Sequence, residues 1–143
     1  MMTDSAPLHV LLVEDDDVAA EAVMRSMRRA GIPCPITWVE DGQAALDVLR
    51  NEDAQRQAPR PRLILLDLNM PRMNGFEFLE AVRADPRLHE EIIFVLTTSS
   101  ADADRSRAYD GNVAGYMIKS AVGPQFAKLT QLLAGYRSAV QLP

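Results

Sequence analysis

The chain has 143 residues, of which 48% are hydrophobic, as is typical of a single globular domain. Its net charge of −5 argues against non-specific binding to nucleic acid, because such binding depends on neutralising phosphates. The sequence has no apolar run close to the roughly 20 residues that span a membrane. Residues 1–7 show no signal-peptide pattern, and the single cysteine, Cys34, indicates a reducing, cytoplasmic location.

The apolar run at residues 8–13 predicts a first strand, which ends in the four acids of residues 14–17. A helix is predicted next, because apolar residues recur at helical spacing and a glycine follows them. The residues that set this pattern are Ala19, Ala22, Val23, Met27 and Ala30, with Gly31 as the stop. Acids favour the positive end of a helix, but four in a row repel one another unless a cation lies among them.

Residues 36–39 predict a second strand, and Ala45, Leu46 and Leu49 predict a helix that ends near Arg50. The polar segment 51–62 contains two prolines and predicts a long, exposed loop without chemistry of its own.

Four aliphatic residues at positions 63–66 predict a central strand, because a run buried on both faces is typical of a parallel sheet. The strand ends on Asp67, and Pro71 and the Asn74–Gly75 pair break it. Ligands bind at the carboxyl edge of such sheets. An aspartate in this position can also be only a turn former or a helix cap.

The remaining pattern repeats strand and helix to the end of the chain. A helix from Phe76 to about Asp85, a strand at 92–96, a weak helix at 102–109, a strand at 115–118 and a helix from Phe126 are predicted. Strand and helix thus alternate five times. This predicts a five-stranded parallel sheet with right-handed crossovers and helices on both faces, an α/β doubly wound fold.

Polar residues at the strand ends form one predicted set: Glu14, Asp15, Asp67, Thr97 and Lys119. Parallel strands place all their carboxyl ends on one edge, so these residues should meet there. Two carboxylates can bind Mg²⁺, and a third can attack phosphorus as a nucleophile. A lysine and a threonine can hold phosphate oxygens. The set suits phosphoryl transfer, which needs mainly positioning and neutralisation of charge.

These segments resemble the receiver domain of two-component response regulators over residues 7–137, with 138–143 as a C-terminal extension. The matching pieces are residues 13–16, 66–75, 96–99 and 115–119. The resemblance implies the flavodoxin-like strand order 2-1-3-4-5. It also implies a phospho-accepting signalling protein, not an enzyme.

The resemblance implies a role for each site residue. Asp67 would accept phosphate from a histidine kinase, while Thr97 and Lys119 hold the phosphoryl group. The Mg²⁺ ligands would be Glu14, Asp15, Asp67 and the backbone carbonyl of Asn69. Tyr116 would act with Thr97 as a switch. The sequence alone favours a plain aromatic residue of an edge strand at Tyr116.

Two positions depart from the family pattern. Many relatives have aspartate where this chain has Glu14, and proline where it has Ser120. Flanking residues narrow the likeness to stand-alone regulators paired with bacterial phytochrome kinases; they are residues 96–100, 107–110, 119–120, 51–62 and 140–143. This likeness implies a phytochrome-type kinase as partner. No output domain follows residue 143, so we expect the regulator to act through its own surface, by binding a partner, relaying phosphate onward or serving as a phosphate sink.

A heptad-like apolar stripe runs along the last predicted helix, formed by Phe126, Leu129, Leu133, Tyr136 and Val140. Packing on the sheet explains the stripe only as far as Leu133. We therefore expect a homodimer in which residues from about Tyr136 onward contact the partner. A flexible tail on a monomer is the alternative.

Three other functions match parts of this pattern. A phosphatase of the haloacid dehalogenase type would need a second aspartate at position 69, which is Asn69. A receiver-like scaffold that is never phosphorylated would not need the full set of site residues. A flavin- or nucleotide-binding module would need a glycine-rich loop after the first strand, where residues 14–17 are acidic and would repel phosphate.

Overall fold

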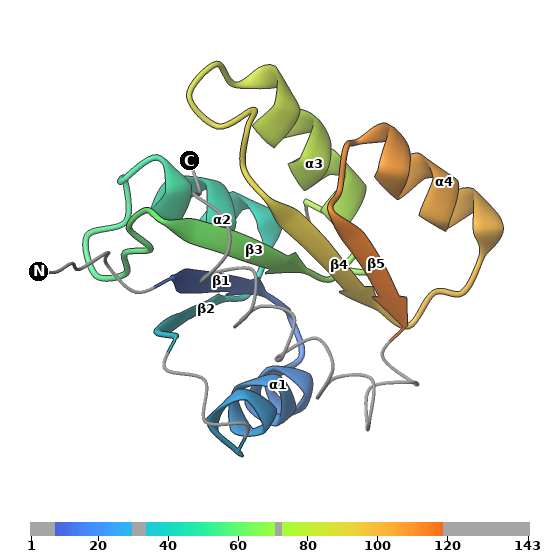
Figure 1. Cartoon of the computed structure of the whole chain (residues 1–143). Helices are drawn as coiled ribbons and strands as arrows, with labels where there is room; N and C mark the ends of the chain where they lie inside the picture. Colours follow the sequence, from blue (N-terminus) through green and yellow to red (C-terminus); the bar gives the residue numbers. More distant parts are fainter. Residues whose placement is uncertain (1–7, 30–33, 71–72, 119–143) are drawn as a thin grey trace, which may run out of the picture.

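The computed structural model describes residues 8–29, 34–70 and 73–118 (Figure 1). Several predictions lie outside these ranges. They are the role of Lys119, the last helix, and dimerisation through residues from Tyr136 onward.

Strands and helices alternate along the described chain. In order they are β1 His9–Val13, α1 Asp17–Arg29, β2 Ile36–Val39, α2 Gly42–Leu49, β3 Arg62–Leu66, α3 Gly75–Ala84, β4 Ile93–Thr97, α4 Asp102–Asp110 and β5 Gly115–Ile118. All strand pairs are parallel, in the order β2-β1-β3-β4-β5. The predicted doubly wound fold is therefore confirmed. None of the described helices has the length and apolar character that crossing a membrane requires.

Helices cover both faces of the sheet, α1 on one side and α2, α3 and α4 on the other (Figure 1). A hydrophobic core lies on each face of the sheet, and alternate residues of the central strand β3 pack into one core or the other. Ile64 and Leu66 pack with α2, α3 and α4, whereas Leu63 and Leu65 pack with α1. All four are fully buried. Burial on both faces explains why β3 reads as an unbroken aliphatic run.

The buried face of α1 differs from the predicted one only at two alanines. Val23 and Met27 are buried as expected, but Ala22 is exposed and Ala20 is fully buried. Alanine is apolar yet too small to fix a face by itself, so three alanines among four residues carry little directional information.

The prediction of a wholly exposed loop at residues 51–62 is wrong at two positions. Arg62 belongs to β3, and only 6% of this residue is exposed. Ala58 is also buried. The guanidinium of Arg62 donates to the carbonyl of Ala58 at 2.9 Å and to both carboxylate oxygens of Glu91. A buried charge needs such a partner, and the polar composition of the segment concealed it.

Candidate functional site

The strands β1, β3 and β4 end side by side at one edge of the sheet. Val13 is in register with Leu66, and Leu66 with Val95. The backbone N–H of Asp67 donates to the carbonyl of Val13 at 3.0 Å. The edge therefore brings together four of the five predicted strand-end residues, namely Glu14, Asp15, Asp67 and Thr97.

Three carboxylates meet at this edge. One oxygen each from Glu14, Asp15 and Asp67 lies within 4.8 Å of the others. Glu14 and Asp67 are buried, with 2% and 6% exposed, while Asp15 is exposed to solvent. Like charges this close repel one another, and a hard divalent cation with oxygen ligands offsets that repulsion. The donor set thus fits Mg²⁺ or a similar ion.

Hydrogen bonds to residues of β2 hold the backbone of Glu14 in place. Its N–H donates to the carbonyl of Val39 at 3.0 Å, and its own carbonyl accepts from the Trp38 indole at 2.7 Å. The longer glutamate side chain still joins the acidic cluster, and its Oε2 accepts from the N–H of Asp16 at 3.2 Å. The role of Trp38 had no signal in the sequence, because it depends on pairing between β1 and β2.

Asp67 lies next to the loop residue Asn69. The N–H of Asn69 donates to Oδ1 of Asp67 at 3.2 Å. The Asn69 side-chain amide lies 3.4 Å from the hydroxyl of Thr97, which is itself fully buried at the end of β4. A phosphoryl group on Asp67 would therefore find hydroxyl and amide donors beside it, in addition to the acidic cluster.

Ser99 connects Thr97 with Tyr116. The Ser99 N–H donates to the Thr97 hydroxyl at 3.3 Å, and the Tyr116 hydroxyl donates to the Ser99 carbonyl at 3.0 Å. The Ser99 hydroxyl also donates to Asp104 on α4, and Arg105 lies 5.9 Å from the centre of the Tyr116 ring. Tyr116 therefore shares a hydrogen-bond network with Thr97 through Ser99.

Gly75 lets α3 approach the loop behind Asp67. Its N–H donates to the carbonyl of Leu68 at 3.0 Å. A Cβ added at Gly75 would lie 2.6 Å from the Cα of Leu68 and 2.8 Å from the carbonyl oxygen of Asp67. Asn74 and Glu77 complete a capping box at the start of this helix. From the sequence, Gly75 is predicted only to break the strand. Its close approach to the loop is a tertiary contact, which local sequence patterns do not report.

Residues 10–132 match the family described as the response regulator receiver domain. The chain belongs to this family. The matched segment contains every predicted site residue, including Lys119. The family predicted from the strand-end motifs is therefore confirmed.

Two curated relatives show the range of similarity. The probable methanogenesis regulatory protein FilR2 of Methanothrix harundinacea is 42% identical over 113 residues, covering 79% of this chain and 72% of the relative. The response regulator Rcp1 of Synechocystis is 35% identical over 114 residues, covering 80% of this chain and 78% of Rcp1. Both are similar over most of their length.

Solved structures share the fold. The phosphorylated cyanobacterial phytochrome response regulator RcpA is 33% identical, with a TM-score of 0.82 over 96% of this chain and 99% of RcpA. The Mn²⁺-bound form of Rcp1 is also 33% identical, with a TM-score of 0.79 over 96% of this chain and 99% of Rcp1. The chain is therefore a receiver-domain response regulator, related to one regulator that is phosphorylated and to another that binds a divalent metal.

Proposed function

We propose that this chain accepts a phosphoryl group on Asp67 from a histidine kinase in a Mg²⁺-dependent reaction. The observation that carries the proposal is the meeting of Asp67 with Glu14 and Asp15, with carboxylate oxygens within 4.8 Å of one another. The phosphorylated state of RcpA and the bound Mn²⁺ of Rcp1 support it, since both share this fold.

The chemistry requires no general base. A deprotonated oxygen of Asp67 attacks the phosphorus of a phosphohistidine, the phosphorus–nitrogen bond breaks, and its electron pair remains on the imidazole. The product on this chain is an aspartyl phosphate. When bound by Glu14, Asp15, Asp67 and the carbonyl of Asn69, Mg²⁺ supplies positive charge to the phosphoryl oxygens.

Thr97 and Lys119 would hold the transferred group. A hydroxyl donor from Thr97 and the ammonium group of Lys119 would each bond a phosphoryl oxygen. Rotation of the Thr97 hydroxyl toward phosphate would alter its contact with the Ser99 N–H. Because Tyr116 donates to the carbonyl of Ser99, the same movement would reach β5. Thr97 and Tyr116 would thus form the switch.

The proposed partner is a phytochrome-type histidine kinase in the cytoplasm, and the phosphorylated regulator would signal through its own surface. The likeness to the phytochrome response regulator RcpA supports this partner. Transfer rates from a panel of purified histidine kinases would test it. We expect a phytochrome-type kinase to transfer fastest.

Asp67→Asn should abolish phosphorylation, because the amide has no anionic oxygen to attack phosphorus. The measurement is transfer of radiolabel from a small acyl phosphate donor in the presence of Mg²⁺. Asp17→Asn, which removes an exposed acid at the start of α1, is the matched control and should keep full labelling. Label retained in Asp67→Asn would contradict the acceptor. Failure of the wild type to accept label would favour the unphosphorylated scaffold.

Mg²⁺ should raise the melting temperature of the chain by relieving repulsion among Glu14, Asp15 and Asp67. At a hundredfold excess over its dissociation constant, the ion would add about 2.7 kcal/mol to the free energy of unfolding. Asp15→Asn should weaken this response, whereas Asp110→Asn at the exposed end of α4 should preserve it. An unchanged melting temperature in wild type, together with metal binding unaffected by Asp15→Asn, would refute the metal site.

We also propose that the chain forms a homodimer through its C-terminal helix and residues from Tyr136 onward. The heptad-like spacing from Phe126 to Val140 supports this, because the stripe is longer than packing on one sheet requires. Sedimentation of the full chain should give a dimer, and a version ending at Gly135 should give a monomer. The same oligomeric state in both would contradict a role for the tail.

A further inference from the structure

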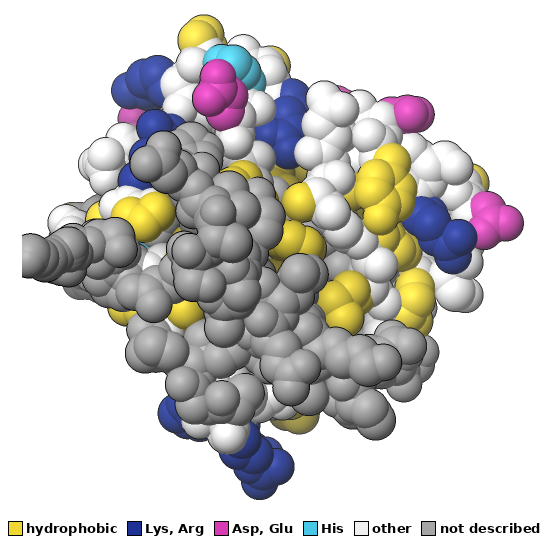
Figure 2. All heavy atoms as spheres, in the orientation of Figure 1, with side chains coloured by type: hydrophobic (Ala, Val, Ile, Leu, Met, Phe, Trp, Pro, Cys, Tyr) yellow, Lys and Arg dark blue, Asp and Glu magenta, His cyan; other side chains and the backbone are white. Residues whose placement is uncertain are grey.

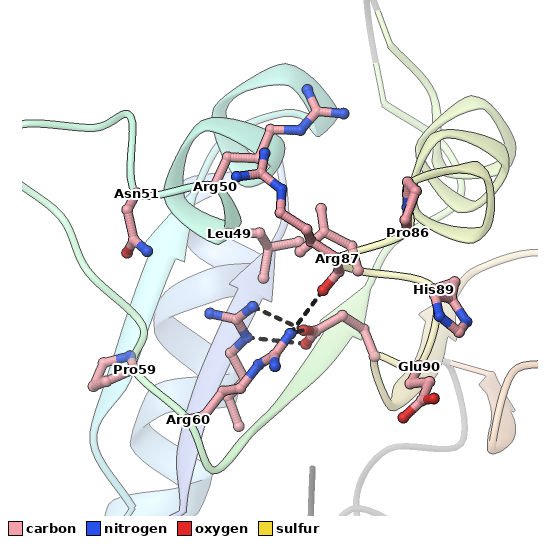
Figure 3. Close-up of a pocket in the computed structure, with 12 residues that line it drawn as sticks. Leu49, Arg50, Asn51, Pro59, Arg60, Pro86, Arg87, His89 and Glu90 are labelled. Atoms are coloured by element: carbon pink, nitrogen blue, oxygen red, sulfur yellow. Dashed lines mark hydrogen bonds and ion pairs between the residues drawn. The ribbon is translucent and has the colours of Figure 1, made fainter.

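A cavity lies at the amino edge of the sheet, at the opposite end of the strands from Asp67. Its volume is about 720 Å³, and it lies between the end of α2 and the loop after α3 (Figure 3). Figure 2 shows arginine or lysine side chains gathered beside that loop, on the upper left of the view. Basic residues concentrated on a chain of net charge −5 point to an anionic ligand.

Two arginines of this cavity share one carboxylate. Nε of Arg50 donates to Oδ2 of Asp85 at 3.1 Å, and Nε of Arg87 lies 3.9 Å from Oδ1. The backbone N–H of Arg87 and the guanidinium of Arg50 hold the pKa of Asp85 below its usual value. The ionised carboxylate therefore keeps both guanidiniums close together despite their like charge.

The terminal N–H groups of these two arginines remain available. Among the described residues, the side chains of Arg50 and Arg87 interact only through Nε, so their Nη groups have no hydrogen-bond partner there. The two side chains are 27% and 72% exposed. Charge at the C-terminal ends of α2 and α3 explains why arginines occur here. It does not explain why two guanidinium groups lie beside the same carboxylate.

Arg60 adds a third positive group from the opposite wall (Figure 3). Its Nη2 donates to the carbonyl of Arg87 at 2.9 Å and to Glu91 at 3.1 Å. Glu91 is already paired in two hydrogen bonds with the buried Arg62. Glu90 also lines the cavity. Four guanidiniums therefore face the three carboxylates of Asp85, Glu90 and Glu91, and the pocket retains a small excess of positive charge.

We propose that this cavity binds a phosphate-bearing small molecule, with a phosphate group between Arg50 and Arg87. A planar guanidinium group can donate two parallel hydrogen bonds to phosphate oxygens. A phosphate with two negative charges balances two guanidinium groups, whereas one carboxylate balances only one. The volume lies within the roughly 300–1,000 Å³ of small-molecule sites. The site is separate from Asp67, because it lies at the opposite ends of the strands.

Amide NMR shifts would test the site on the full chain, with pyrophosphate and ATP as probes. EDTA is present throughout, so that Mg²⁺ cannot recruit phosphate to the acidic cluster. We expect saturable shifts at residues 50 and 85–89 with either probe. Arg50→Gln and Arg87→Gln should each weaken binding about tenfold, the loss of roughly one charge-assisted bond. Arg25→Gln, on the exposed surface of α1, should leave affinity unchanged.

Binding of pyrophosphate and ATP alike identifies phosphate as the recognised group, and binding of ATP alone identifies a nucleotide. Adenosine that binds as tightly as ATP would overturn phosphate recognition. Wild-type affinity in both glutamine variants, shifts confined to residues 14, 15 and 67, or no saturable binding would also overturn the proposal. Arg87 is largely exposed, so its variant keeps the test decisive if Arg50→Gln fails to fold.

Discussion

Replacing Glu91 by alanine is expected to lower the free energy of unfolding by about 3–5 kcal/mol, because it leaves the buried charge of Arg62 without its partner. Arg62 donates to the two oxygens of Glu91 at 3.0 and 2.8 Å. Only 6% and 3% of these side chains are exposed, so solvent shields the charge of Arg62 poorly once the carboxylate is lost. The loss is a large part of the about 5–15 kcal/mol that stabilises a typical domain. Urea denaturation measures it directly.

Two variants control for other effects of this change. Glu90→Ala removes an exposed carboxylate one residue earlier and should alter stability by at most about 0.5 kcal/mol. The double variant Arg62→Met with Glu91→Leu removes both charges and should recover most of the loss, since apolar pairs often replace buried ion pairs. A double variant as unstable as Glu91→Ala would show that the buried charge is not the cause.

Gly75→Ala is expected to disturb the proposed phosphoryl site itself. The new methyl group would lie 2.6 Å from the Cα of Leu68 and 2.8 Å from the carbonyl oxygen of Asp67. Both are backbone atoms and cannot rotate away, so either α3 or the loop after β3 must move. Overpacking of this kind costs about 1–3 kcal/mol. If Asp67 is the acceptor proposed above, a displacement approaching 1 Å would slow phosphotransfer by about 100-fold.

Gly111→Ala is the matched control for this substitution. A methyl group there would meet the Ala108 carbonyl oxygen at 3.2 Å and a Leu79 methyl at 3.4 Å, with nothing closer. We expect wild-type phosphotransfer from this variant. Urea denaturation and initial rates of radiolabel transfer should be measured on both variants. Wild-type rates and stability in Gly75→Ala would refute the close approach.

The sequence by itself determined the fold and the position of the site. The aliphatic run at 63–66 and the alternation of strands with helices predict a parallel sheet, and the observed order confirms it. The site followed from topology, because parallel strands place their carboxyl ends on one edge. Glu14, Asp15, Asp67 and Thr97 could therefore be grouped before any distance was measured.

Only the tertiary structure decided contacts between segments that are distant in sequence. Arg62 and Glu91 are 29 residues apart, and neither lies in a pattern that marks it as buried. The need for glycine at position 75 arises where α3 meets the backbone of another segment. The guanidinium groups of Arg50 and Arg87 lie close together because both interact with the carboxylate of Asp85, one from the end of α2 and the other from the loop after α3. Hydrophobic periodicity reports which elements form and which face is buried, whereas polar partners and close backbone approaches depend on how those elements pack.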